Sequence, residues 1–138
     1  MNDNAIEQEI QAKGLTAPRI TPADLKANIA TEHYFTALDG VVGEFANSGC
    51  GVTEESRAEL GKSLGLLTFC VLVLKNGFTV TGESACASPE NFDAEIGRKI
   101  ARANAEQKVW PLMGYELKER LHQQRLPAQA PSGQEHRP

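Results

Sequence analysis

The sequence predicts an α+β fold in which a β-hairpin packs against one long C-terminal helix, with shorter helices on its flanks. Two apolar runs rich in β-branched residues, 68–74 and 78–82, flank Asn76-Gly77, a dipeptide typical of hairpin turns. A pattern with helical spacing then extends to about residue 122. The length of 138 residues fits one domain. We expect this domain over 21–122, after a weakly ordered segment 1–20 and before a disordered tail 123–138, rich in proline and polar residues.

Two helices and a loop are predicted between the N-terminal segment and the hairpin. A capping threonine followed by a proline, Thr21-Pro22, predicts a helix over about 22–36. The glycine-rich stretch 40–52 has the composition of a long loop. Thr53 followed by two glutamates predicts a short helix over 54–62.

The Asn76-Gly77 dipeptide predicts a two-residue type I′ turn, in which both residues have positive φ. That turn places Val73 opposite Val80, and its other pairs follow: Lys75 with Phe78, Val71 with Gly82, Leu74 with Thr79 and Leu72 with Thr81. The first strand is apolar on both faces, so we expect it at the centre of a sheet or buried on both sides. A single buried helix over 60–74 is the competing interpretation. Because an isolated hairpin is marginal in water, helices must cover it or a second copy must extend it.

The long helix is expected to begin at Ser88, as its cap, with Pro89 at the first position. Its large apolar face is expected to lie on the hairpin and contains Phe92, Ile96, Ile100 and Ala103. Its small-residue face either packs closely within the chain or forms a helix contact in a homo-oligomer, with a dimer as the first expectation; it contains Ala94, Gly97, Ala101 and Ala105. Pro111 is expected to break or kink the helix after Trp110.

Composition excludes several classes of function. The net charge of −4 and the pI near 5.4 disfavour nucleic-acid binding, which needs clustered Lys and Arg. No apolar run reaches the roughly 18 residues of a membrane span, and the polar, acidic start of the sequence does not resemble a signal peptide. Three cysteines at wide spacing fit the reducing cytoplasm, and they do not combine with the three histidines into a zinc pattern. We expect no metal and no cofactor.

A ligand pocket is expected where the second strand of the hairpin meets the long helix. His33 or Tyr34 would stack on a ring, and Arg98 or Lys99 would reach a phosphate; the remaining candidates are Glu83, Ser84 and Asn91. Each has a structural alternative: packing of the aromatic cluster in the core, capping at the helix start, and a solvated helix face. No catalytic residue is predicted, because Cys86, near the helix start, has no histidine nearby in the sequence.

The run NGFTVTGESACASPENFDAEIGRKIA, followed by WPLMGYELKERL, resembles the gene product 49 / gene 66 family of small tailed-phage and prophage proteins. The resemblance covers about residues 21–122 and is carried by several motifs, among them Asn76-Gly77-Phe78, Gly82-x-Ser84-x-Cys86 and Trp110-x-Leu112-x-Gly114-Tyr115. It does not extend to the stretch 40–52 or to the tail. It implies a non-virion accessory protein made in the bacterial cytoplasm during infection or lysogeny, with no assigned catalytic residues.

Two functions from different classes follow as expectations. The first is a phage accessory protein, not an enzyme, that binds and modulates a host protein, with counter-defence as one setting. The alternative is an oligomeric binder that sequesters a small nucleotide signal. Nucleic-acid binding comes third because of the acidic pI, and an enzyme comes last.

Overall fold

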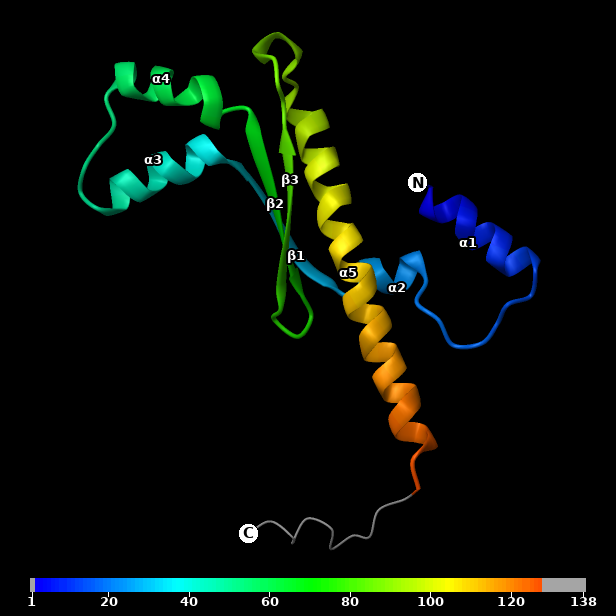
Figure 1. Cartoon of the computed structure of the whole chain (residues 1–138). Coiled ribbons are helices and arrows are strands. Elements are labelled where there is room, and N and C mark those ends of the chain that lie inside the picture. Colours follow the sequence, from blue (N-terminus) through cyan, green and yellow to red (C-terminus); the bar gives the residue numbers. More distant parts are fainter. Residues whose placement is uncertain (1, 128–138) are drawn as a thin grey trace, which may run out of the picture.

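The computed structural model describes residues 2–127 and shows an α+β fold (Figure 1). Three antiparallel strands, β1 (Ile29–Thr36), β2 (Leu67–Leu74) and β3 (Thr79–Ala85), form a sheet in the order β1-β2-β3. The long helix α5 (Ala94–Arg125) lies on one face of the sheet, over β3 and β2. The predicted hairpin with its long C-terminal helix is therefore confirmed, and a third strand extends the hairpin.

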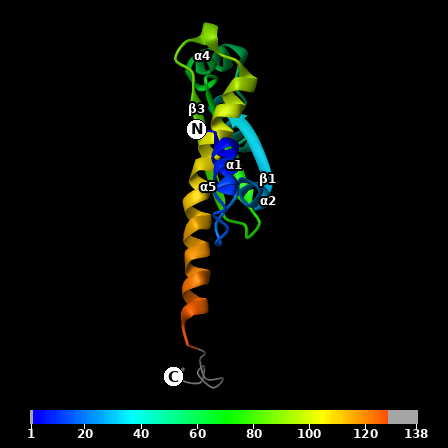
Figure 2. The same cartoon turned by 90° about the vertical axis from the view of Figure 1, so that its right-hand side faces the viewer.

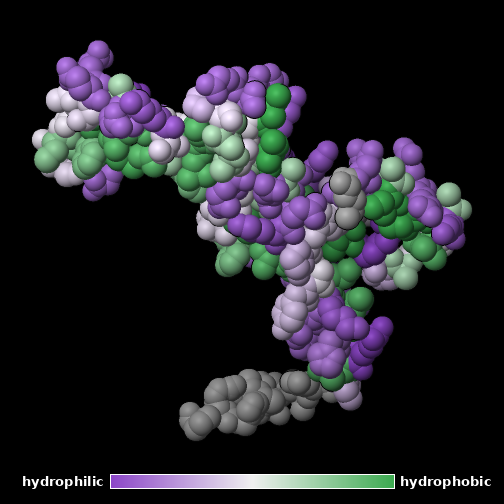
Figure 3. All heavy atoms as spheres, turned by 45° about the horizontal axis from the view of Figure 1, so that its top comes forward, coloured by the Kyte–Doolittle hydropathy of each residue, from purple (hydrophilic) through white to green (hydrophobic). Residues whose placement is uncertain are grey.

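Shorter helices lie on both sides of this unit (Figure 1). The helices α3 (Ala37–Asn47) and α4 (Glu54–Leu64) pair into an arm that connects β1 to β2 and projects from one end of the sheet. In Figure 3 hydrophobic atoms gather on the α3 side of this arm, at the left of the view. The helices α1 (Asp3–Ala12) and α2 (Pro22–Ala27) lie across α5 from the arm.

Strand β1 replaces most of the helix that was predicted over 22–36. Helix α2 begins as predicted, where the Thr21 hydroxyl accepts a hydrogen bond from a backbone N–H of the first turn, but it ends at Ala27. Residues 29–36 pair instead with β2, far along the chain. The prediction was wrong because the apolar residues here have helical spacing, while the strand depends on a partner that local sequence does not reveal.

Helix α3 occupies most of the stretch that was predicted to be a loop over 40–52. Thr36 and Asp39 form a capping box: the Asp39 N–H donates to the Thr36 hydroxyl at 3.1 Å, and the Thr36 N–H donates to the Asp39 carboxylate at 2.9 Å. Gly40 and Gly43 stand inside the helix, where a Cβ would meet open space. The loop was predicted from the glycine content of the stretch. The prediction was wrong because the capping box stabilises the start of a helix that tolerates these glycines. The short helix predicted over 54–62 is confirmed as α4.

The hairpin is confirmed, but its predicted register is wrong by one residue: Val73 faces Thr79, not Val80. The turn contains three residues, Lys75 to Gly77. The Gly77 N–H donates to the Leu74 carbonyl at 2.9 Å, and the Leu74 N–H donates to the Phe78 carbonyl at 2.8 Å. Of these turn residues Gly77 alone has a positive φ, of 90°. This is the geometry of a type I turn followed by a bulge, which needs one left-handed residue where a type I′ turn needs two.

The small residues of α5 face the sheet, and the large ones do not. Gly97, Ala101 and Ala105 are buried, while Ile96 and Ile100 are 55% and 46% exposed. The prediction that the large apolar face lies on the hairpin was therefore wrong. The predicted oligomer interface consisted of these three residues and Ala94. Because the three are buried inside the chain, they cannot contact a second copy, and Ala94 alone is exposed.

The start of α5 differs from the prediction. Asp93 is the cap, because its carboxylate accepts a hydrogen bond from the Ile96 N–H at 3.0 Å. The Ser88 side chain makes no capping bond, and Pro89 begins a separate 3₁₀ turn, η1 (Pro89–Asn91). Of the two outcomes predicted at Pro111, a break or a kink, the break does not occur, since α5 continues through this residue.

Both ends of the chain carry predictions about order. The first 20 residues, which were predicted to be weakly ordered, contain α1. The Arg19 guanidinium donates two hydrogen bonds, of 2.6 and 2.8 Å, to the Glu7 carboxylate of this helix. The predicted tail begins within α5, and its residues 128–138 lie outside the described part of the chain. No helix between residues 2 and 127 is long and apolar enough to cross a membrane.

One cluster of buried side chains forms the hydrophobic core between the sheet and α5. It draws on β2, β3, α2 and α5, and contains Leu25, Cys70, Leu72, Leu74, Val80, Ala101, Ala105 and Val109. The side chains of β2 alternate between this core and the other face, which stays only half-buried. The sheet thus has one covered and one open face.

Candidate functional site: the groove between β1 and α5

A groove separates the edge strand β1 from α5, because α5 lies over β2 and β3. It consists of two hollows of about 380 and 90 Å³, and both are lined by Tyr34 and Arg98. Tyr34 faces α5 because it is paired with Cys70, whose side chain points into the core. Strand and helix thus bring together residues that are far apart in the sequence.

A hydrogen-bonded network forms one wall of the groove. The Tyr34 hydroxyl donates to Glu32 Oε1 at 2.6 Å. The Arg102 guanidinium donates to the same Glu32 oxygen and, at 3.0 Å, to Glu106. This network ties the edge strand β1 to the helix α5.

The network shifts the acid–base properties of its members. Partial burial, and then the hydrogen bond to Glu32, raise the pKa of Tyr34 to about 12. The hydrogen bonds from Tyr34 and Arg102 lower the pKa of Glu32. At neutral pH the groove therefore contains a neutral phenol, an ionised carboxylate and a guanidinium whose two carboxylate partners raise its pKa.

Arg98 differs from the other cations of the groove. Arg102 is paired with two carboxylates, and Lys99 lies 3.5 Å from Glu95. Within residues 2–127 Arg98 takes part in no ion pair closer than 4.0 Å, and it lies where the two hollows meet. Its guanidinium can therefore donate to a ligand without breaking an ion pair.

The structure separates the other predicted ligand residues from this groove. His33 is exposed on the opposite sheet face, where its Nε2 is 3.0 Å from Thr31 Oγ1. Glu83 is exposed on that same face, at the edge strand β3. Ser84 lies half-buried on the α5 side of β3, and Asn91 is exposed in η1. The predicted set therefore does not form one pocket, and Tyr34, Arg98 and Lys99 are the members that meet.

Three residues of the network, Glu32, Arg102 and Glu106, were not predicted as site residues. The sequence contains one indication for Arg102, because Glu106 follows it at the spacing of a helical ion pair. The same spacing is also typical of a solvated helix face. No sequence pattern indicated Glu32, because its contacts with Tyr34 and Arg102 depend on the strand β1, which was not predicted.

The groove combines an aromatic ring with cations and carboxylates. Its acidic and basic side chains balance, and Tyr34 offers an aromatic ring beside Arg98. The Cys86 thiol, the nearest candidate nucleophile to the start of α5, donates to the Ser88 carbonyl at 3.1 Å. Among residues 2–127 no three His, Cys, Asp or Glu side chains are close enough together to hold a metal.

The uncovered face of the sheet is a second candidate surface, called here the open sheet face. Its centre is the outer row of β2, which includes Phe69, Val71 and Val73, all half-buried. Phe35 of β1 stacks on Phe69 with 5.6 Å between ring centroids and is 39% exposed. The edges are mostly polar and include Thr31, His33, Thr79, Thr81 and Glu83.

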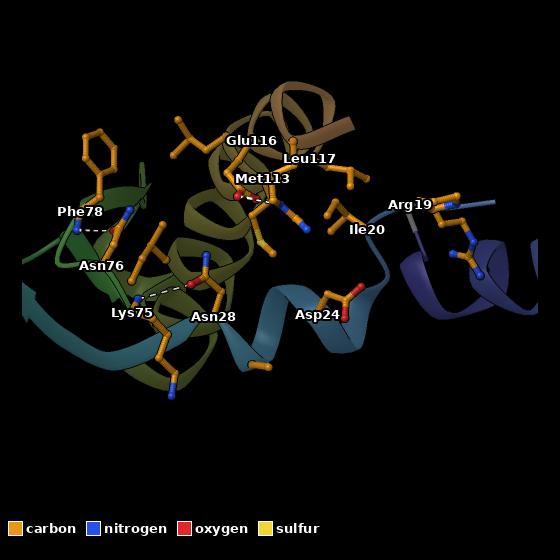
Figure 4. Close-up of a pocket in the computed structure, with 15 residues that line it drawn as sticks. Arg19, Ile20, Asp24, Asn28, Lys75, Asn76, Phe78, Met113, Glu116 and Leu117 are labelled. Carbon is orange, nitrogen blue, oxygen red and sulfur yellow. Dashed lines mark hydrogen bonds and ion pairs between the residues drawn. The ribbon is translucent and has the colours of Figure 1, made fainter. Parts of the chain in front are cut away.

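A third hollow, of about 860 Å³, lies between α2, the hairpin turn and the C-terminal half of α5 (Figure 4). Its apolar lining comes from all three and includes Ile20, Leu74, Phe78, Leu112, Met113 and Leu117. Charged residues surround it, among them Arg19, Asp24, Lys75, Glu116 and Arg120. We call this hollow the α5 groove.

A family model described as the phage protein (N4 Gp49/phage Sf6 gene 66) family matches residues 20–121. The chain belongs to this family. The expected resemblance to gene product 49 / gene 66 proteins is therefore confirmed over most of the chain. No curated protein and no solved structure matches the chain.

The region that matches the family begins just before α2 and ends inside α5. It includes β1 and the whole sheet, and thus both the groove between β1 and α5 and the open sheet face. Helix α1 lies outside it.

Proposed function

We propose that this phage protein binds and modulates a host protein, and that the open sheet face is the surface that binds it. The setting is the bacterial cytoplasm during infection or lysogeny, and counter-defence is one role that such binding can serve. The protein acts in this proposal by binding and not as an enzyme.

The observation that carries the proposal is that the central strand is apolar on both faces while only one face is covered. The inner row of β2 packs on α5, whereas Phe69, Val71 and Val73 are left half-buried on the outer side. A continuous apolar patch on a sheet is unfavourable in water and is typical of an interaction site. The centre of this face lacks charged side chains, as the centres of protein interfaces do.

Site-specific photo-crosslinking in the bacterial host tests the proposal. A photoreactive phenylalanine analogue replaces Phe35, whose ring is exposed on the open sheet face. The same analogue in place of Tyr115, which is 75% exposed on α5, is the matched aromatic control. We expect one dominant protein adduct from position 35 and not from position 115. Equal adduct patterns from both positions would contradict the proposal.

A pair of lysine substitutions adds a second test. Val71→Lys places a charge at the centre of the open sheet face, and Ile96→Lys places one on the exposed, apolar outer side of α5. We expect Val71→Lys to abolish capture of the adduct partner and Ile96→Lys to preserve it. Thermal unfolding followed by circular dichroism checks that both variants fold.

The groove between β1 and α5 favours a second candidate function, the sequestration of a small nucleotide signal. Tyr34 can stack on a base, while Arg98 and Lys99, which line the same hollow, can reach a phosphate. The carboxylates of Glu32, Glu95 and Glu106 weaken this candidate, because they neutralise most of the positive charge in the groove.

Native mass spectrometry of protein purified gently from infected cells separates the two candidates. An added mass of a few hundred daltons that is lost on denaturation supports nucleotide capture, and a protein adduct supports host modulation. Arg98→Ala combined with Lys99→Ala abolishes nucleotide capture under the second candidate and leaves the fold intact. Capture that survives both substitutions would exclude this groove as the nucleotide site.

A further inference from the structure

The stripe of α5 that packs on the sheet continues beyond the sheet. Positions four residues apart, each turned by about 40° from the one before, form a stripe that winds around the helix: Gly97, Ala101, Ala105 and Val109 under the sheet, then Met113, Leu117 and Leu121. The first four are buried by β2 and β3, whereas the last three are only half-buried. The apolar pattern therefore extends further than the sheet that covers it.

The lengths of the elements explain this mismatch. Helix α5 has 32 residues and is about 48 Å long, whereas the eight residues of β2 span about 27 Å. The C-terminal half of α5 consequently projects past the sheet, as Figures 1 and 2 show. The apolar side of this projecting segment is not covered by the sheet, and most of the stability of a helix in a protein comes from packing of its apolar face.

The α5 groove offers the place where this packing can occur. Met113 and Leu117 form its helical wall, and Ile20 and Phe78 form the walls contributed by the segment before α2 and by the hairpin (Figure 4). Phe78 is 54% exposed and Leu112 is 39% exposed, so the lining remains open to solvent in one copy of the chain. A groove of this kind accepts the apolar side of an amphipathic helix.

Two residues of opposite charge in the groove can pair reciprocally with the same two residues of a second copy related by a two-fold axis. Glu116 and Arg120 both line the groove, and their side chains are 2.8 Å apart. In an antiparallel pair of α5 helices whose two-fold axis passes midway between these two residues, Glu116 comes opposite the partner subunit's Arg120, and Arg120 comes opposite the partner subunit's Glu116. Such a reciprocal pairing is the property of an isologous two-fold interface.

We propose that the α5 groove binds the C-terminal half of α5 from a second copy of this chain, in an antiparallel two-fold dimer. Apolar contacts along Met113 and Leu117 supply the affinity, and the Glu116–Arg120 pairs set the antiparallel direction. This interface lies away from the small-residue stripe under the sheet and away from the open sheet face. It does not rest on the proposed function.

Charge reversal tests the pairing with complementary variants. Glu116→Arg places like charges opposite each other across the axis, and so does Arg120→Glu. We expect each single variant to raise the dimer Kd by about tenfold or more in sedimentation experiments at low salt. A mixture of the two variants pairs Arg with Glu at both contacts and is expected to form a heterodimer. Repulsion within one helix cannot be relieved by mixing, so the mixture isolates the contact between copies.

Two further variants test the apolar contact. Leu117→Asp places a charge in the groove and is expected to give a monomer, while Tyr115→Ser, on the exposed side of the same helix, is expected to leave the dimer unchanged. A dimer with a micromolar Kd is almost fully formed at a protein concentration of about 100 μM. A wild-type protein that remains monomeric at this concentration would overturn the proposal. A dimer unaffected by Leu117→Asp, or a mixture of charge variants that does not associate, would also overturn it.

Discussion

Gly82 of β3 lies directly beneath Ala101 of α5, closer than a side chain would allow. A Cβ on Gly82 would overlap the Ala101 carbonyl oxygen and would lie 2.9 Å from the Cα atom of Ala105. The backbone of the strand therefore approaches the backbone of the helix, and the distance between sheet and helix depends on small residues in both. This explains why the small face of α5 is the buried one.

Gly82→Ala is predicted to destabilise the protein strongly. The added methyl group meets backbone atoms of α5 that cannot turn aside, so the helix must move away from the sheet. Overpacking of this kind costs about 1–3 kcal/mol, and more where backbone is involved. Urea unfolding followed by circular dichroism measures the change.

Gly114→Ala is the matched control for this prediction. Gly114 lies in the projecting half of α5, and a Cβ there would meet nothing within 4 Å. Replacing a helical glycine by alanine at such a position stabilises by up to about 1 kcal/mol. If the two variants changed the free energy of unfolding in the same direction, the proposed close contact at Gly82 would be wrong.

The orientation of α5 shows how far the sequence alone can lead. The spacing of the residues predicted both the large apolar face and the small-residue face of the helix. It did not predict which of the two faces packs on the sheet. Large residues usually bury more apolar surface, which favoured Ile96 and Ile100. The deciding feature is a glycine on another element, and its effect is visible only when strand and helix are placed together.

Strand β1 and helix α3 were missed for different physical reasons. Residues 29–36 are stabilised by pairing with β2, and long-range pairing overrides local helical spacing. In α3 the capping box between Thr36 and Asp39 marks the start of the helix, whereas the glycine content of residues 40–52 predicted a loop. The groove between β1 and α5 could be predicted only in part for the same reason, since Tyr34 and Glu32 reach it through β1.

Gly77→Ala is predicted to cost about 1–2 kcal/mol of unfolding free energy, because φ is +90° at this position and alanine is strained there. Gly77→Asn is expected to cost less, since asparagine tolerates left-handed backbone better. Gly43→Ala, in open space within α3, is the control and is expected not to destabilise. Thermal unfolding of the three variants compares them, and equal stability of Gly77→Ala and wild type would refute the turn geometry.

Tyr34 is predicted to ionise at a pH well above that of an ordinary tyrosine. In a Tyr115→Phe variant Tyr34 is the remaining tyrosine, so absorbance at the tyrosinate band follows it alone. We expect a midpoint of about 12 in the folded protein, against a reference value of 10.0. Because the folded pKa is raised, its contribution to stability is complete below pH 10 and is lost as the pH rises toward 12.

The titration of Tyr34 also tests its hydrogen bond to Glu32. Glu32→Gln removes the negative charge that opposes ionisation of the phenol, so the midpoint is expected to move down while partial burial keeps part of the shift. The same titration in a denaturant gives the unfolded reference. A folded midpoint equal to that reference would show that Tyr34 is not held in the network.

The ion pair between Glu7 and Arg19 is predicted to dock α1 against Trp110, the single tryptophan of the chain. Hydrogen bonds from Arg19, and then from Gln11, lower the pKa of Glu7 to about 2. The folded pKa is depressed, so the stabilisation is present above the unfolded value of about 4.3 and is lost as the pH falls toward 2. Acrylamide quenching of tryptophan fluorescence should therefore stay low until the solution is strongly acidic.

Glu7→Gln is expected to release α1 at every pH and to increase the quenching of Trp110 already at neutral pH. Glu9→Gln is the matched control, because Glu9 pairs locally with Lys13, the residue that caps the end of α1, and both side chains are exposed. Quenching should rise in the first variant and stay at the wild-type level in the second. If both variants behaved like the wild type, apolar contacts of Ile6 and Ile10 near Trp110 would have to hold α1 without the ion pair.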